Sequence, residues 1–517
     1  PDGAVVISQP GPGQAFGGRL FIQGTQLEHF MKKALVVIGG LVVVGAACTS
    51  IAWYTGKQLP EVLETSLAQS NRQLAAALSG SGSGKVELLS LETGLFSSEA
   101  RYRLTLDGAE GEHVQLDFKD HLEHGPFPWS RVKRLQLAPV MAASNYVLEK
   151  NDDSAPWFDV TGGQAPLQGS MSVGYDGAIH NELQLAPFEA SGEDEFSLSF
   201  SGLTLRMDSA LEGGGLRLDG ELGRVALMTG GEAPVSVTLK GIALSSDLTM
   251  SSYDYFVGSM NLDIAESNLS FAANQSLHFG KFEQRDVYSI EDTGLSLKQA
   301  VNLADISFSG NPIGSTRFAW SVERLDPQAV GSLVKWYEQN LVQLQSAALG
   351  AAPDSGAQML DDPQLQAPLR QLLAGGPRIT LKELALTTAN GESRFDLDLD
   401  LSGKGLEGIP LEQAFAQSVK ALQTNLKISK PMIGDLAALR ARLEGLDAEQ
   451  VRQASASGEM VGMIAAQSQM ATIKGDDILV QLGYADGQVD FNGQKMSVDQ
   501  FAALVQQRTA GFSGTAQ

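Results

Sequence analysis

A single apolar run constrains this chain more than any other feature. After Lys32 and Lys33, residues 34–54 carry no charged side chain. At about 1.5 Å per residue, a helix of this length crosses a hydrocarbon core about 30 Å thick. No later stretch of the sequence is apolar enough to cross again. We therefore expect one transmembrane helix that contacts the lipid bilayer through residues 34–54 and holds one large body on one side of the membrane.

The residues around this run indicate its orientation. Lys32 and Lys33 precede it and favour a cytoplasmic N-terminus, while Trp53 and Tyr54 at its far end suit the membrane interface. The body is then expected on the side away from the cytoplasm. Three alternatives remain open for the run: a cleaved signal peptide, a lipoprotein signal that ends at Cys48, and a buried core helix.

The chain before the body divides into three expected segments. Residues 1–30 are irregular and rich in glycine, and Met31 followed by two lysines has the form of a natural start. We expect residues 1–30 to be a non-native or disordered extension. Residues 31–56 are the expected anchor, and residues 57–84 are expected to form a helical stalk that ends in a flexible Gly/Ser joint.

Composition excludes several classes of function. The 517 residues are enough for two to four domains or one elongated domain, and the net charge of −23 argues against nucleic-acid binding. The same charge argues against a peripheral grip on anionic lipid headgroups. The only cysteine, Cys48, lies inside the apolar run, so the body has no disulfide, no thiolate nucleophile and no cysteine-ligated metal.

Residues 85–326 have the pattern of a β-rich body. Apolar and polar residues alternate in one stretch after another, and Gly, Asn, Asp and Ser clusters separate the stretches. No fixed repeat length is present. The pattern predicts a long antiparallel meander, and one apolar face per strand implies a sheet that is covered on one side only or curled on itself.

Residues 327–517 predict a mixed part that continues from this body. Hairpins are expected around Asn390-Gly391 and Asp486-Gly487. Helices are expected at residues 327–349, 364–373, 411–446, 448–472 and 497–507. The predicted fold class is thus α+β and β-rich, with an N-terminal transmembrane helix followed by a large antiparallel meander sheet with packed helices.

Two patterns resemble metal sites, and neither is complete. His121 and His124 are spaced for one face of a helix, but Gly125-Pro126 would end that helix at once. We expect a turn in which His124 bonds to the backbone and Phe127 packs. Asp398 and Asp400 begin like a calcium loop, yet they alternate with leucines as on a solvated strand face. No metal, cofactor or catalytic residue is expected.

Three short motifs carry a resemblance to a known family. They are Trp53, Tyr54 and Gly56; Gly94, Phe96, Ser97 and Ser98; and His124, Gly125, Pro126, Phe127 and Pro128. On these motifs the chain from Met31 onward resembles the YdgA family, bacterial envelope proteins defined by a domain of unknown function. The resemblance implies a single-pass inner-membrane protein with a periplasmic body, and it implies no catalytic residues.

These features favour binding or scaffolding over catalysis. In one hypothesis the half-apolar sheet curls into a groove that shields the acyl chains of a lipid or other amphiphile. In a second hypothesis helices cover the apolar face, and the protein is an envelope scaffold that self-associates or binds a partner. A hydrolase with a dispersed site is a third, weaker hypothesis.

Overall fold

The computed structural model describes residues 82–510 together with positions 67, 68, 71 and 74. Within that range it leaves out residues 109–112, 193–195, 211–213, 232–233, 254, 272–274, 349–361, 404–408 and 410. The extension at residues 1–30, the anchor at residues 31–56 and the motif residues Trp53, Tyr54 and Gly56 lie outside the described residues. Within the described part of the chain, no helix has both the length and the apolarity to span a bilayer.

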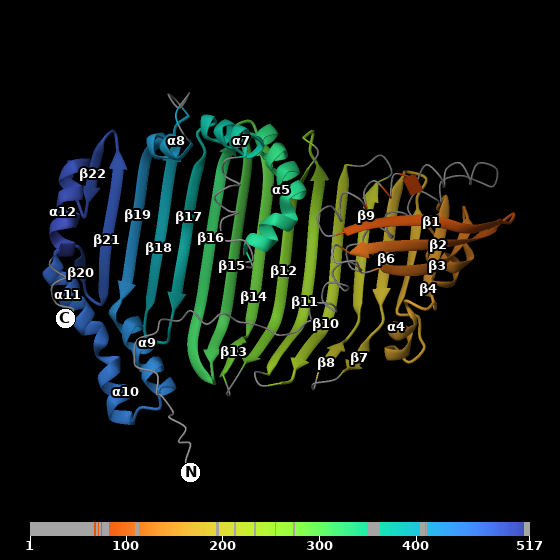
Figure 1. Cartoon of the computed structure of the whole chain (residues 1–517), viewed down its shortest axis with the longest axis horizontal. Coiled ribbons are helices and arrows are strands. Elements are labelled where there is room, and N and C mark those ends of the chain that lie inside the picture. The colour runs from red at the N-terminus through yellow and green to blue at the C-terminus, as the bar shows by residue number, and fades with distance from the viewer. Residues whose placement is uncertain are drawn as a thin grey trace, which may run out of the picture.

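The described residues form one continuous sheet of 23 strands, and all of its strand pairs are antiparallel (Figure 1). Its first part contains β1 (Gly82–Thr93), β2 (Ser97–Gly108), β3 (His113–His124), β4 (Ala142–Glu149), β5 (Leu167–Val173), β6 (Ala178–Leu185), β7 (Phe188–Ser191), β8 (Ser197–Phe200) and β9 (Leu203–Ala210). Its middle part contains β10 (Gly215–Thr229), β11 (Val235–Met250), β12 (Phe256–Phe271), β13 (Gln275–Phe279), β14 (Lys281–Glu291), β15 (Gly294–Phe308) and β16 (Asn311–Leu325). Its last part contains β17 (Arg378–Thr387), β18 (Glu392–Leu401), β19 (Val419–Ser429), β20 (Thr472–Lys474), β21 (Asp477–Ala485), β22 (Gln488–Phe491) and β23 (Gln494–Ser497).

The sheet is a meander with small detours. β1 to β6 pair in sequence, and β6 then pairs with β9, which leads through β10 and β11 to β12. From β12 the order runs through β14 to β19 and then through β21 to β23. The short strands β8, β13 and β20 pair alongside this path. The predicted β-rich body with a large antiparallel sheet is confirmed.

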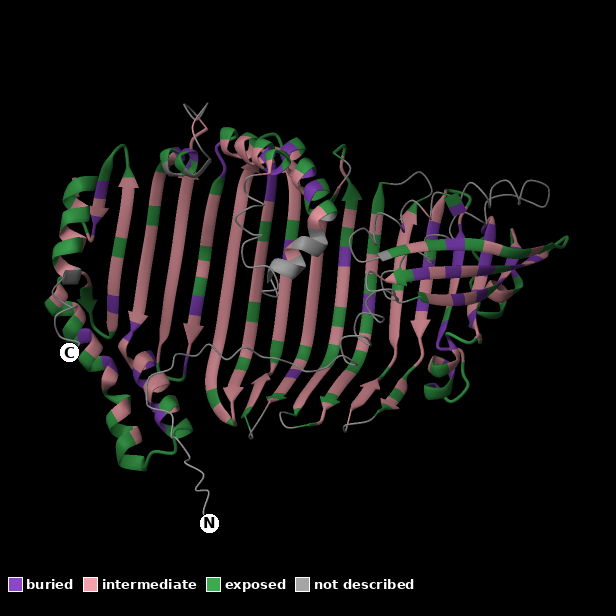
Figure 2. Ribbon diagram, viewed as in Figure 1, coloured by how far each residue is buried: buried purple, intermediate pink, exposed green. Residues whose placement is uncertain are grey.

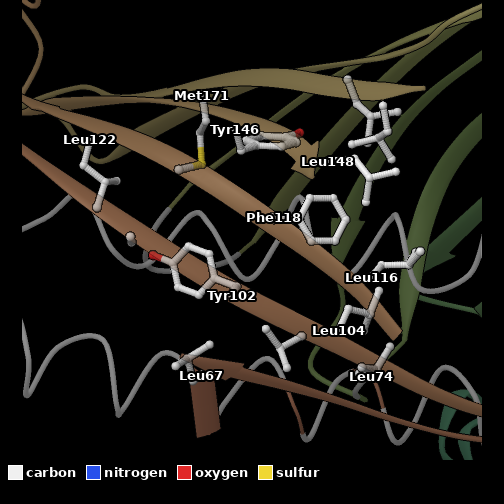
Figure 3. Close-up of a cluster of buried hydrophobic side chains, with 14 of the residues drawn as sticks. Leu67, Leu74, Tyr102, Leu104, Leu116, Phe118, Leu122, Tyr146, Leu148 and Met171 are labelled. Carbon is white, nitrogen blue, oxygen red and sulfur yellow. The ribbon is translucent and has the colours of Figure 1, made fainter. Parts of the chain in front are cut away.

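The fully buried core lies at the N-terminal end of this sheet. β2 and β3 alternate between buried and less buried residues, except at the end of β3, where Leu122 and Glu123 are both buried. One face of each strand therefore packs into the core. Phe118 and Tyr146 are the largest fully buried side chains in this core, and the helical residues Leu67 and Leu74 cover it from one side (Figure 3). Figure 2 shows the same concentration of buried residues around β1 to β6, whereas the long central strands are mostly of intermediate exposure.

The helices gather mainly at the ends of the strands. They are α3 (Trp129–Lys133), α4 (Ala155–Val160), α5 (Pro327–Ala348), α7 (Pro363–Ala374), α8 (Leu411–Ser418), α9 (Lys430–Leu443), α10 (Ala448–Ser455), α11 (Ser457–Ser468) and α12 (Val498–Ala510). In Figure 1, α7 and α8 lie along the upper ends of the central strands, α5 crosses their upper part, and α9 and α10 lie below β19. α12 packs beside β22, where Phe491 and Phe501 are in contact, with ring centroids 5.4 Å apart.

Two predictions about local structure are wrong. Residues 411–446 are not one interrupted helix, because residues 419–429 form β19, which fills the place between β18 and β21. Pairing on both sides outweighs the helical propensity of this segment. The predicted Gly/Ser joint at residues 79–84 is also wrong in its last part, because Gly82 to Gly84 belong to β1 and pair with the end of β2. The two predicted hairpins are confirmed.

Candidate functional site

Two of the three motifs come together at the edge where β2 begins and β3 ends. The amide of Gly94 donates to the carbonyl of Ser97 at 2.9 Å, which closes the turn before β2. The amide of His124 donates to the carbonyl of Phe96, also at 2.9 Å, and the Ser98 hydroxyl lies 3.1 Å from Nε2 of His124. The sequence separates these motifs by about one hairpin, and antiparallel pairing of β2 with β3 joins them.

The surroundings of His124 indicate a structural role. Burial lowers its pKa, so the ring is neutral at pH 7, and its hydrogen bond with Ser98 joins two neutral groups. Ser98 is only 2% exposed, so its hydroxyl is not open to a substrate. His121 points to the opposite face of β3, because strand residues three apart alternate sides, and its Nδ1 lies 2.5 Å from Glu99. The two histidines therefore cannot share a metal ion.

The third motif continues from His124 as a tight turn. The peptide bond between Gly125 and Pro126 is cis, and the amide of Gly125 donates to the carbonyl of Met141 at 2.7 Å. A Cβ atom on Gly125 would lie 1.9 Å from the carbonyl oxygen of Val140, so only glycine fits here. The expectation that Phe127 packs is wrong: its side chain is 59% exposed.

A buried carboxyl group lies deeper in the same part of the sheet. Asp120 is fully buried on β3, and burial raises its pKa to about 6. The Ser144 hydroxyl donates to its Oδ1 at 2.7 Å, while its Oδ2 has no hydrogen-bond partner among the described residues. Asp120 lies between Phe118 and Leu122 in the series of inward-facing residues of β3. Its position in this alternating pattern indicates, from the sequence, that its carboxyl group faces the core.

Asp120 gives the folding stability a pH dependence. Its pKa is higher in the folded state than in the unfolded chain, so this group stabilises the fold less as pH rises from about 4 to above 6. Replacing Asp120 with Asn removes that loss. From pH 4 to pH 7.5 the variant is expected to gain roughly 1–3 kcal/mol of unfolding free energy relative to the wild type. Urea unfolding at both pH values measures this, and a difference that does not change with pH would contradict it.

The central sheet presents the second candidate site, which we call the apolar face. It comprises inward positions on β10 to β12, β14 to β19 and β21, and the strand registers align these positions in rows across the sheet. One row contains Leu244, Leu262, Val301, Phe318, Leu384, Phe395, Leu426 and Val480. Another contains Leu248, Tyr288, Leu297, Val322, Ile379, Leu399, Leu422 and Tyr484. All of these side chains are half-buried except Leu384, which is exposed.

A polar band crosses this face between the two rows. Asp286 is 6% exposed, and its two carboxylate oxygens accept hydrogen bonds from Gln284 at 2.6 Å and from Gln299 at 2.9 Å. The indole of Trp320 donates to Oε1 of Gln299 at 2.9 Å. Within the described residues no cation pairs with Asp286. Burial, and in second place the charge of Asp286, raise the pKa of Tyr288.

The opposite face of the same strands is charged and internally paired. Asp398 pairs with Arg378, and Asp400 pairs with Arg324 and Lys420. A hollow of about 760 Å³ lies over this face between β18 and β22. Asp398 and Asp400 thus belong to a paired strand surface, and no group of three metal-ligating side chains occurs in the described part of the chain.

Comparison with known proteins places the chain in a family. A family model described as bacterial protein of unknown function (DUF945) matches residues 31–499. The chain belongs to the DUF945 family. Protein YdgA of Escherichia coli K12 is 28% identical over 503 residues, which cover 92% of this chain and 97% of that protein. The resemblance to the YdgA family is confirmed.

Two further relatives are similar to this DUF945 chain. The uncharacterized protein YihF of Escherichia coli K12 is 23% identical over 486 residues, covering 91% of this chain and 98% of that protein. An uncharacterized protein of Haemophilus influenzae is 29% identical over 181 residues, covering 34% of this chain and 49% of that protein. No solved structure matches.

Proposed function

We propose that this DUF945 protein acts without catalysis in the bacterial cell envelope and binds a lipid or other amphiphile on the apolar face. Residues 34–54 anchor it in the inner membrane by a single pass, with the N-terminus in the cytoplasm and the body in the periplasm. The uncharged run and the lysines before it support this placement.

The half-exposure of the apolar face carries the proposal. Ten strands about 4.8 Å apart, each of nine residues or more at about 3.3 Å per residue, make a surface roughly 40–50 Å wide and at least about 30 Å long. Its area of roughly 1,000 Å² or more exceeds the few hundred Å² that soluble monomers usually leave apolar and open. In the described residues the face is not sealed as the N-terminal core is, because its leucines, valines and phenylalanines retain solvent contact. Acyl chains have the shape and chemistry to cover such a surface.

The polar band makes one level of the apolar face chemically different from the rest of it. Asp286, Gln299 and Trp320 form a hydrogen-bonded network among apolar side chains on the middle strands, which places polar atoms at one level of the face. An amphiphile has one polar end and one apolar end, so a narrow polar band beside apolar rows fits it better than a uniformly apolar surface would.

Analysis of co-purifying molecules tests the proposal. The body, residues 58–517, retains Leu67 and Leu74 of the core and is to be exported to the periplasm and purified without detergent. Mass spectrometry is expected to find phospholipid or another amphiphile in near-stoichiometric amount. A stable, lipid-free body would contradict the proposal, and crosslinking in intact cells would then identify the partner or second copy that a scaffold requires.

A further inference from the structure

Large apolar side chains lie uncovered at one end of the molecule, far from the apolar face. Seven of them are between 59% and 85% exposed. We call them the tip surface: Leu95, Phe96, Phe127, Trp129, Leu135, Leu137 and Tyr175. Phe96 belongs to the second motif and Phe127 to the third, and Leu95 and Trp129 lie directly beside these motifs. Two motifs of the sequence therefore contribute to this surface.

The strand topology brings these residues to a common edge. β1, β3 and β5 end there, and β2, β4 and β6 begin there. A chain of backbone hydrogen bonds links the turns in order: His124 to Phe96, Gly125 to Met141, and Met141 to Val173. In Figure 1 the turn between β1 and β2 forms the extreme right end of the molecule. The tip surface is thus built from separate turns that lie at one edge of the sheet.

Three cations accompany it in a chain whose net charge is −23. Arg131 and Lys133 lie in α3, and Arg134 follows directly. Arg131 donates to the Ser172 hydroxyl at 2.8 Å, and Arg134 donates to Ser170 and Asn145, so both guanidinium groups have neutral partners. Among the described residues none of the three forms an ion pair with a carboxylate. Their charge is therefore available to an anionic partner.

We propose that the tip surface docks onto the face of an anionic lipid bilayer. Its aromatic and aliphatic side chains enter the interfacial layer, and Arg131, Lys133 and Arg134 contact lipid phosphates. Lys133 already lies 5.5 Å from the centre of the Trp129 ring, which places a cation beside an aromatic side chain of the kind that membrane interfaces favour.

Two arguments favour lipid over a protein partner. Projecting turns with aromatic and basic side chains suit a soft interface, whereas a protein partner requires a flat or grooved surface of matching shape. The predicted anchor on the same chain also holds the tip surface near a membrane, so even weak insertion is effective. The proposal does not depend on amphiphile binding by the apolar face.

A fluorescent label at the tip tests the docking. In a Cys48→Ser background, Leu95→Cys carries an environment-sensitive fluorophore, and Gln488→Cys in β22 at the far end of the sheet is the matched control. The full chain is reconstituted in phosphatidylcholine vesicles with or without phosphatidylglycerol, some of whose lipids carry a nitroxide quencher. We expect strong quenching at position 95 with phosphatidylglycerol, little quenching at position 488, and a several-fold loss after Lys133→Glu but not after Lys474→Glu.

Three outcomes would overturn the proposal. A label at position 95 that reports water in anionic vesicles excludes insertion. A label that reports an apolar setting which lipid quenchers do not reach makes the occupant a protein or a second copy. Finally, equal quenching at position 95 with and without phosphatidylglycerol, unchanged by Lys133→Glu, excludes contact between these cations and anionic lipid. None of these outcomes bears on lipid co-purification with the apolar face, so the two proposals fail separately.

Discussion

A carboxylate at Val301 is expected to abolish amphiphile binding while the protein remains folded. Val301 lies on β15 in the middle of the apolar face, between Gln284 and Phe318 in the strand register. An acyl chain lying across this position would bury the new charge without a partner, which costs several kcal/mol. The affinity for a fluorescent fatty acid is expected to fall by more than about tenfold, equivalent to about 1.4 kcal/mol.

The next residue of the same strand supplies the control. Asn302 points to the opposite, charged face, where it pairs in register with Arg317 and is exposed. Asn302→Asp adds the same charge with almost no change in shape, and we expect unchanged fatty-acid affinity. Equal losses in both variants would show that the charge acts through the fold or the net charge, and retained binding in Val301→Asp would remove the apolar face as the binding surface.

The second large expected effect is a difference in unfolding free energy between substitutions in the core and substitutions on the apolar face. Phe118 is 2% exposed in the N-terminal core, so Phe118→Ala is expected to lower the unfolding free energy by roughly 3–5 kcal/mol. Phe318 is half-buried on β16, and Phe318→Ala removes fewer contacts, so we expect a loss of about 1–2 kcal/mol. Urea unfolding followed by far-UV circular dichroism measures both.

One result of the comparison between the two phenylalanines would contradict the amphiphile proposal. If Phe318→Ala destabilises the protein as much as Phe118→Ala, the apolar face is itself a sealed core. The amphiphile proposal would then lose the observation that supports it, and an envelope scaffold with a covered sheet would be the better account.

Local alternation was enough to predict much of this fold. The strands between residues 85 and 326 and the hairpins at Asn390-Gly391 and Asp486-Gly487 follow from period-two patterns and turn residues. β19 escaped prediction because its helical composition is overruled by partners on both sides, and partners distant in sequence leave no local signal.

The candidate sites were harder to predict from the sequence than the strands. Asp120 and Asp286 occupy inward positions of alternating strands, so their burial was readable once the strands were assigned. The tip surface could not be predicted from the sequence, because its residues come from turns that only strand pairing brings together. The net charge gave no sign of the three cations around Arg131, because they contribute little to a sum over 517 residues.

The meander also has a consequence for how the chain is made. Nearly every strand pairs with one close to it in sequence, so few long loops have to close before pairing begins. A chain that emerges N-terminus first during synthesis can seal the core around Phe118 early and then add strands one by one to its growing edge. Each new edge is covered by the next hairpin to emerge, which limits the time in which an unpaired strand is open to aggregation. The order of synthesis and the order of assembly are then the same.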